Sequence, residues 1–239
     1  MSVILVEGGR KLSGAVTVQG AKNSVLPMLA ATVLCPGICC LRGCPALSDV
    51  DTAVQIIRHL GGTVRREGPD LVVDTRQITG CEIPEELMGR MRSSVMFLGA
   101  ILGRCGEAVC SQPGGCDLGP RPIDLHLYAL RAMGAEIEEK SGRLRCRGAA
   151  LHGAEIFLRT PSVGATENAI LAACAASGTT VISNAAREPE IMELQDFLRA
   201  MGACVQGAGS ATVVVEGRKK LHGCTHRVRP DRIVAATYL

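Results

Sequence analysis

Aromatic side chains are nearly absent from this sequence. Trp does not occur, and the 239 residues include only two Tyr and three Phe. Proteins that bind single-stranded nucleic acids commonly stack the bases on aromatic rings, and this chain offers few rings for that purpose. The core must therefore be built from Leu, Ile, Val, Ala and Met, and the composition argues against a base-stacking surface.

The sequence also lacks an excess of charge of one sign. It has 26 basic and 23 acidic residues, and the formal net charge of +3 is too balanced to indicate a nucleic-acid partner. No apolar run is long enough to span a bilayer, and the opening residues lack the basic flank and apolar stretch of a secretory signal. We therefore expect a cytoplasmic globular protein with neither a membrane nor a nucleic-acid partner.

Cysteine, by contrast, is abundant. Twelve cysteines would suggest disulfides in a secreted chain, but without an export signal we expect free thiols. Cys35, Cys39, Cys40 and Cys44 lie close enough in sequence for a zinc site to be considered. The adjacency of Cys39 and Cys40, with no C-x-x-C spacing and no nearby His, argues against zinc. We expect no metal and no cofactor.

An internal repeat is the strongest signal in the sequence. Residues 57–64, 130–137 and 198–205 each read as the end of an amphipathic helix, a glycine that closes it, and the start of a strand. The closing glycines are Gly61, Gly134 and Gly202. Because they recur about every 70 residues, the chain repeats one supersecondary unit three times.

Each unit is predicted to have the order β-α-β-α-β-β. An apolar first helix and a short strand precede the helix that ends at the repeated glycine. We expect the first helices at residues 22–34, 89–103 and 163–176, and the strands that follow them at 38–41, 107–110 and 180–183. In the first unit, residues 15–18 are expected to form the strand that leads into the first helix.

The first helix of each unit has almost no polar face. Between Ala165 and Ala176 the third copy consists largely of Ala, Ile and Leu, and a helix without a polar face has to be buried on all sides. We therefore predict an α/β fold, an inside-out α/β barrel domain in which three such helices pack together and sheets and more polar helices surround them. An open α/β sandwich of loosely similar units is the alternative, and the regular spacing favours closure.

A loop in the second unit carries a candidate for catalysis. Residues 112–126 are rich in Gly and Pro and include Cys116, whereas the matching loops of the other units are shorter. Arg121 nearby favours the thiolate form of a cysteine. Pro122 is predicted in the first turn of the next helix, whose N-terminus can hold an anion. A mobile lid over a site and a surface loop with an incidental thiol fit this pattern equally well.

Cations and free backbone N–H groups are predicted at the starts of the three apolar helices. Lys22 and Arg92 begin the first two, and Ser162-Val163-Gly164 begins the third. Taken alone, Lys22 is best explained as a solvated helix-end residue. If the three helices converge, however, their N-termini and the two cations form an anion-binding site. Simpler roles are assigned to the helix-capping Asp49, Asp51 and Glu190 and to His126, which we place at the surface.

Several motifs, in order and across the whole chain, resemble those of the UDP-N-acetylglucosamine 1-carboxyvinyltransferases. They lie at residues 20–23, 113–116, 121–126, 162–166, 185–190 and 230–233. The resemblance implies transfer of enolpyruvyl from phosphoenolpyruvate to the 3′-hydroxyl of UDP-N-acetylglucosamine with release of phosphate, the first committed step of peptidoglycan synthesis. The related enolpyruvylshikimate-phosphate synthases share the fold but lack this cysteine loop.

The resemblance also implies roles for individual residues. By position, Cys116 corresponds to the loop thiol that donates a proton, forms an adduct with phosphoenolpyruvate and is labelled by fosfomycin. Lys22 and Asn23 correspond to phosphoenolpyruvate contacts. The implied contacts to UDP-N-acetylglucosamine are Arg92, Arg121, Pro122, Ile123, Asp124, Leu125, Ser162, Val163 and Gly164.

Two departures from the family pattern matter. The family enzymes contain a second, similar domain that supplies a carboxylate base and further arginines, and Val234 and Ala236 replace a usual acidic residue and a usual glycine. We expect residues 22–229 to form one domain, residues 1–21 and 230–239 to belong to the absent domain, and the truncated chain to be inactive alone. The alternative is a non-catalytic nucleotide-sugar-binding remnant, or a subunit that needs a separate C-terminal half. The Cys116 loop argues against a shikimate-type acceptor.

Overall fold

The computed structural model describes residues 3–11, 13–111 and 122–239. Cys116 and Arg121, predicted above as site residues, lie outside the described residues. Every cysteine that the structure describes is a free thiol, as the sequence predicts.

Three sheets contain the strands that follow the repeat. The first has the order β11-β1-β3-β2, the second β4-β6-β5 and the third β7-β8-β10-β9. The strands are β1 (Ile38–Arg42), β2 (Thr63–Glu67), β3 (Asp70–Asp74), β4 (Glu107–Ser111), β5 (Glu136–Lys140), β6 (Arg143–Arg147), β7 (Glu155–Phe157), β8 (Thr179–Ser183), β9 (Cys204–Gln206), β10 (Thr212–Glu216) and β11 (Thr225–Arg227). Alternate residues of the central strands are buried, for example Val213 and Val215 of β10, so each sheet turns one face to the core.

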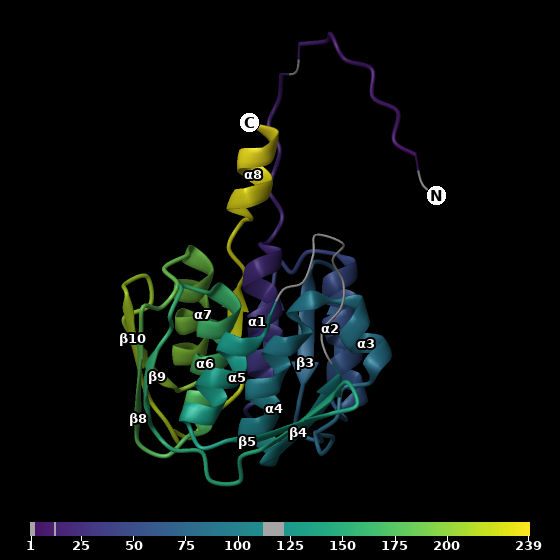
Figure 1. The fold of residues 1–239 in the computed structure, drawn as a ribbon. Coiled ribbons are helices and arrows are strands. Elements are labelled where there is room, and N and C mark those ends of the chain that lie inside the picture. The colour runs from purple at the N-terminus through teal and green to yellow at the C-terminus, as the bar shows by residue number, and fades with distance from the viewer. Residues whose placement is uncertain (1–2, 12, 112–121) are drawn as a thin grey trace.

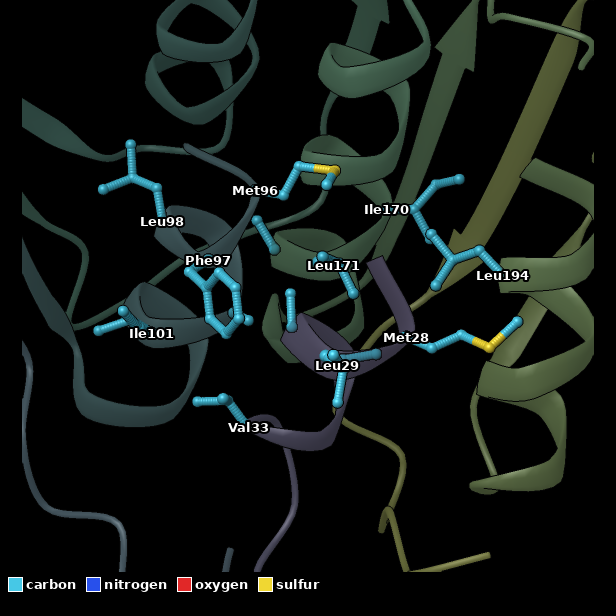
Figure 2. Packing of buried hydrophobic residues seen from close by; sticks show 14 of the residues in the cluster. Met28, Leu29, Val33, Met96, Phe97, Leu98, Ile101, Ile170, Leu171 and Leu194 are labelled. Atoms are coloured by element: carbon cyan, nitrogen blue, oxygen red, sulfur yellow. The ribbon is translucent and has the colours of Figure 1, made fainter. Parts of the chain in front are cut away.

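Three apolar helices lie between the sheets (Figure 1). They are α1 (Lys22–Thr32), α4 (Phe97–Cys105) and α6 (Val163–Ala175), and each contacts the other two. The more polar second helices of the units are α2 (Ser48–His59), α5 (Asp124–Ala132) and α7 (Pro189–Ala200). Side chains from the three apolar helices meet in one cluster, in which Leu29, Phe97 and Leu171 are fully buried (Figure 2). The burial of these helices on all sides matches the prediction made from their missing polar face.

Each sheet takes one parallel partner from the end of the preceding unit. Glu82 bridges to Val109 of β4, and β7 pairs in parallel with β8. The last unit supplies β11, which pairs in parallel with β1, Cys40 lying opposite Thr225. These pairings link the third unit back to the first, so the three units are joined in a cycle rather than in an open row.

The leading strand predicted at residues 15–18 is therefore wrong. Those residues form no strand, Val16 is 93% exposed, and β11 occupies the corresponding edge of the first sheet. A second repeat marks the true edge strands: Leu151-His152-Gly153 precedes β7 and Leu221-His222-Gly223 precedes β11. Both glycines are required, because a Cβ would lie 2.2 Å from the Thr179 carbonyl oxygen at Gly153 and 2.0 Å from that of Ile38 at Gly223.

The continuous helix predicted at residues 89–103 is also wrong. The chain forms α3 (Glu85–Arg90), then the 3-10 turn η1 (Arg92–Met96), then α4. The break falls at Met91, whose backbone is extended (φ −137°, ψ 124°), and the Ser94 hydroxyl donates to the Met91 carbonyl oxygen at 2.6 Å. The break gives the second unit a new N-terminus at Arg92.

Both ends of the described chain leave the body of the molecule. Helix α8 (Arg232–Tyr238) has no buried residue, residues 3–11 and 13–17 are exposed, and both segments extend away from the body (Figure 1). The two segments separate from the body where Gly20 bridges to Pro230. Among the described residues, none of the helices has the length and apolar character needed to cross a membrane.

Candidate functional site

The N-termini of α1, η1 and α6 meet at one cavity. Its volume is about 300 Å³, and its wall includes Asn23 of α1, Arg92 of η1 and the turn Ser162-Val163-Gly164 that begins α6. Ser93 of η1, His126 of α5 and Glu167 of α6 also belong to the polar part of the wall. The convergence of helix starts that the repeat predicts is therefore present, with one cation and one amide among the lining side chains.

The start of α6 is built to present backbone N–H groups. The Ser162 hydroxyl accepts a hydrogen bond from the Ala165 N–H at 3.4 Å, whereas the first N–H groups of any helix lack an acceptor within the helix. Gly164 leaves room for a neighbouring ring, because a Cβ there would lie 3.2 Å from His126 Cε1. The partial positive charge of the helix start and the Arg92 guanidinium both favour an anion in this cavity.

His126 is a buried neutral imidazole and not a surface residue, so that prediction is wrong. It is 8% exposed, and burial lowers its pKa to about 4 although Asp124 acts in the opposite direction. The Asn168 side-chain amide lies 3.3 Å from His126 Nδ1. Because Nδ2 of the Asn168 amide is a donor, His126 Nδ1 accepts and the ring proton is on Nε2. Nε2 faces the start of α6, because a Cβ on Gly164 would lie 3.4 Å from it. His126 therefore supplies an uncharged donor beside the start of α6.

Lys22 does not join the cavity wall. Its Nζ lies 3.1 Å from Asp49 Oδ2 at the start of α2, and its side chain is 44% exposed. Its backbone N–H donates to Asp231 Oδ2 at 3.2 Å, and Asp231 also caps α8. Asp49, in the first turn of α2, therefore pairs with the ammonium group of Lys22, while the next residue of α1, Asn23, lines the cavity.

The residues that follow the cysteine loop are placed less favourably than predicted. Pro122 is not in the first turn of a helix, because α5 begins at Asp124 and Ile123 is its N-cap. The Asp124 carboxylate forms an ion pair with Arg159, and Ile123 and Leu125 pack against the hydrophobic core. None of the residues from Pro122 to Leu125 lines the cavity.

Glu167 also lines the cavity, although the motifs of the sequence do not mark it as a candidate. It lines the cavity yet is only 2% exposed, and its Oε1 atom has no hydrogen-bond partner among the residues that the structure describes. Burial, reinforced by Glu190 and Glu188, raises its pKa well above the usual value. A signal was available: Glu167 is the only charged residue between Val163 and Ala175, in a helix whose other residues are uncharged and mostly apolar or small.

Sequence comparisons point to one family. The profile described as EPSP synthase (3-phosphoshikimate 1-carboxyvinyltransferase) matches residues 6–239. The chain is 53% identical over 239 residues to a protein named UDP-N-acetylglucosamine 1-carboxyvinyltransferase 2 from Caldanaerobacter subterraneus subsp. tengcongensis. It is 48% identical over 242 residues to a protein of the same name from Streptococcus thermophilus. Both matches cover 100% of this chain but only 57% and 58% of the relatives, so the chain spans less than two thirds of their length.

Solved structures share the fold. The enolpyruvyl transferase NikO from Streptomyces tendae superposes with a TM-score of 0.85 at 25% identity, over 97% of this chain and 55% of that one. An EPSP synthase from Acinetobacter baumannii gives 0.73 at 22% identity, over 94% of this chain and 52% of that one, a likeness that concerns the fold alone. The mixed α/β fold thus resembles one domain, about half, of these chains.

Proposed function

Because the chain belongs to the EPSP synthase (3-phosphoshikimate 1-carboxyvinyltransferase) family and is a homologue of UDP-N-acetylglucosamine 1-carboxyvinyltransferases, we propose that it carries one half of an enolpyruvyl transferase site, for phosphoenolpyruvate and UDP-N-acetylglucosamine. The observation that carries this proposal is the cavity at which Asn23, Arg92 and the start of α6 meet. Its cation and helix N-terminus suit the phosphate oxygens that both substrates carry. The proposed context is peptidoglycan precursor synthesis in the cytoplasm.

In the proposed site the work of binding is divided among several residues. Arg92 and the backbone N–H groups of Ser162-Val163-Gly164 hold the diphosphate, and Arg121 with Pro122 to Leu125 contacts the rest of the nucleotide sugar. Asn23 and Lys22 hold phosphoenolpyruvate, for which Lys22 has to leave Asp49; the pair is half exposed and its separation costs little.

The proposed reaction is an addition followed by an elimination. Cys116, as the general acid, protonates C3 of phosphoenolpyruvate, and the 3′-hydroxyl of the sugar attacks C2. Phosphate then leaves C2 as C3 loses a proton. Developing charge on the phosphate is balanced by the cations and helix starts at the cavity, and exclusion of water protects the electrophilic centre.

The domain of this proposal comprises residues 22–229, an inside-out α/β barrel of three repeats, with residues 1–21 and 230–239 as parts of a second domain. The relatives are longer than the match by more than two fifths of their length. We propose that the part of the relatives outside the match supplies the base for the sugar hydroxyl and closes the site. The chain alone then binds ligand with little or no turnover.

Calorimetry on the 239-residue chain tests the site. We expect heat of binding with UDP-N-acetylglucosamine, and we expect Arg92→Ala to weaken it at least tenfold because a charged contact to phosphate is lost. Arg90→Ala is the matched control, since Arg90 is an exposed arginine of α3 that pairs with Glu86. No heat at millimolar ligand, or equal losses in the two variants, contradicts the proposed site.

Two further assays separate binding from catalysis. Phosphate release by the 239-residue chain at a rate typical of an intact enzyme contradicts the claim that the part of the relatives outside the match is needed. Fosfomycin labelling, located by mass spectrometry, reports on the loop thiol. Modification confined to Cys116 among the twelve cysteines supports its activation, and uniform modification of all thiols contradicts it.

A further inference from the structure

Glu167 stands in the cavity wall with an unsatisfied oxygen. It projects from the second turn of α6, the helix whose start forms the anion-holding end of the cavity. Among the described residues nothing donates to its Oε1 atom, although the side chain is 2% exposed. A buried polar atom without a partner costs stability, so such an atom calls for an explanation outside the fold itself.

A second buried carboxylate shows how this fold satisfies such a group when it is structural. Glu193 of α7 is as inaccessible as Glu167, but its Oε1 accepts the Arg229 backbone N–H at 2.7 Å and lies 3.6 Å from His226 Nε2. Burial alone would raise the pKa of Glu193, but the nearby His226 and Ser24 side chains and the Arg229 N–H favour the carboxylate, outweigh burial and lower the pKa. Glu167 has none of these donors, so the two glutamates serve different purposes.

The charges around Glu167 favour its protonated form. Glu190 and Glu188, at the start of α7, both oppose ionisation of Glu167. Glu190 is itself paired with Arg232 at 3.1 Å, so that arginine is engaged elsewhere. From the remaining elements, the groups that share the cavity are Arg92 of η1 and the neutral His126 of α5. A protonated carboxyl at this position has an O–H group available to a molecule in the cavity.

We propose that Glu167 is a ligand-contacting residue that donates a hydrogen bond, as a neutral carboxylic acid, to a phosphate or hydroxyl oxygen of the nucleotide sugar in this cavity. The inference rests on the proposed function and deepens it. With Arg92 and the start of α6, the acid forms a set of donors that matches the acceptor-rich diphosphate. An ionised carboxylate at the same place would repel the ligand, so the site binds the nucleotide sugar best while Glu167 keeps its proton.

The test uses two variants with opposite hydrogen-bonding capacity. Glu167→Gln keeps a donor at the position of the O–H group, and Glu167→Met keeps the length of the side chain but removes every donor. Calorimetric titration of the 239-residue chain with UDP-N-acetylglucosamine is carried out from pH 6 to pH 9, and circular dichroism checks that each variant is folded.

We expect Glu167→Gln to bind within about threefold of the unmodified chain and Glu167→Met to bind roughly tenfold to a hundredfold more weakly. The affinity of the unmodified chain is expected to fall as pH rises, because Glu167 then ionises. The affinity of Glu167→Gln is expected to lack that loss. Glu136→Gln is the control, because Glu136 of β5 is exposed and is not among the residues that line the cavity; it should leave the affinity unchanged at every pH.

The outcomes distinguish this inference from the proposed function. If the unmodified chain binds UDP-N-acetylglucosamine and Glu167→Met binds it with the same affinity at every pH, the role of Glu167 is overturned and the proposed function stands. If both variants bind weakly and their affinities fall with pH as that of the unmodified chain does, the role of Glu167 is also overturned. That result would leave Glu167 only a packing role. Absence of binding by the unmodified chain overturns the proposed function and this inference with it.

Discussion

The side chain of Asn168 accepts a hydrogen bond from the backbone N–H of Gly99, with a distance of 2.8 Å between Oδ1 and N. This contact joins α6 to the first turn of α4, where the backbone has just left η1. The amide nitrogen of the same side chain faces His126. One asparagine on a buried helix therefore fixes both the packing of two central helices and the orientation of an imidazole in the cavity wall.

The close approach of these helices predicts a strong effect of Gly99→Ala. A Cβ at this position would lie 2.5 Å from Asn168 Oδ1 and 2.6 Å from the Asn168 carbonyl oxygen. We expect the free energy of unfolding to fall by about 3 kcal/mol, from overpacking and loss of the buried hydrogen bond. Gly89→Ala is the matched control, because Gly89 is helical and exposed with nothing within 4 Å of a Cβ; it should be neutral or gain up to about 1 kcal/mol. Equal stability of the two variants in urea unfolding contradicts the prediction.

Gly223→Ala is expected to loosen the pairing of β11 with β1. The added Cβ would meet the Ile38 carbonyl oxygen at 2.0 Å, so the strand has to move. The Cys40 N–H donates to the Cys224 carbonyl oxygen at 2.8 Å across this pairing. Hydrogen exchange at the Cys40 amide should therefore become faster, by at least tenfold if the pairing opens locally. Gly8→Ala, in an exposed segment with nothing within 4 Å, should leave this amide unchanged, and an unchanged Cys40 amide in Gly223→Ala would refute the prediction.

The raised pKa of Glu167 leads us to expect a free energy of unfolding that falls as pH rises. Its raised pKa means that the folded chain keeps a proton that the unfolded chain releases above about pH 4.3. This contribution is fully present below the unfolded pKa and is lost through the folded pKa, with a slope that approaches about 1.4 kcal/mol per pH unit between them. Glu167→Gln removes this slope. In urea unfolding, the free energy of unfolding of Glu167→Gln should therefore rise relative to that of the unmodified chain from pH 4 to pH 8. A constant difference between the two proteins across this range would show that Glu167 does not titrate as described.

Glu193 predicts the opposite dependence. Its folded pKa is lowered, so its contribution to stability is present above the unfolded pKa and is lost as pH falls through the folded pKa. We expect Glu193→Gln to lower the free energy of unfolding at pH 7 by about 1–3 kcal/mol, because a carboxylate acceptor becomes a neutral amide. The difference should narrow below pH 4. A destabilisation that persists undiminished at low pH would instead point to a packing defect.

The fold was more accessible to sequence analysis than the site. The repeated glycines Gly61, Gly134 and Gly202 revealed three units, because in each unit a glycine closes the second helix before the next strand begins. The edge strand of the first unit was missed because it lies near the other end of the chain, where β11 follows Gly223. The break at Met91 left no mark either, because the apolar pattern continues on both sides of it.

For the site, the sequence indicated which backbone termini converge but not where the side chains point. Asn23 and Arg92 reach the cavity, but Lys22 is drawn to Asp49 on another element, which local sequence does not reveal. Glu167 was overlooked because its helix was judged by average composition. The average composition of a buried helix does not show that one of its residues is charged.

The cyclic exchange of edge strands has a consequence for synthesis on the ribosome. The first sheet needs β11, so almost the whole described body must leave the exit tunnel before β1 gains its parallel neighbour. Contacts of such large sequence separation slow folding and leave β1 with an uncovered edge in the meantime. The nascent first unit therefore has to wait for its last strand, and this interval is when the chain is most exposed to mispairing with another copy of itself.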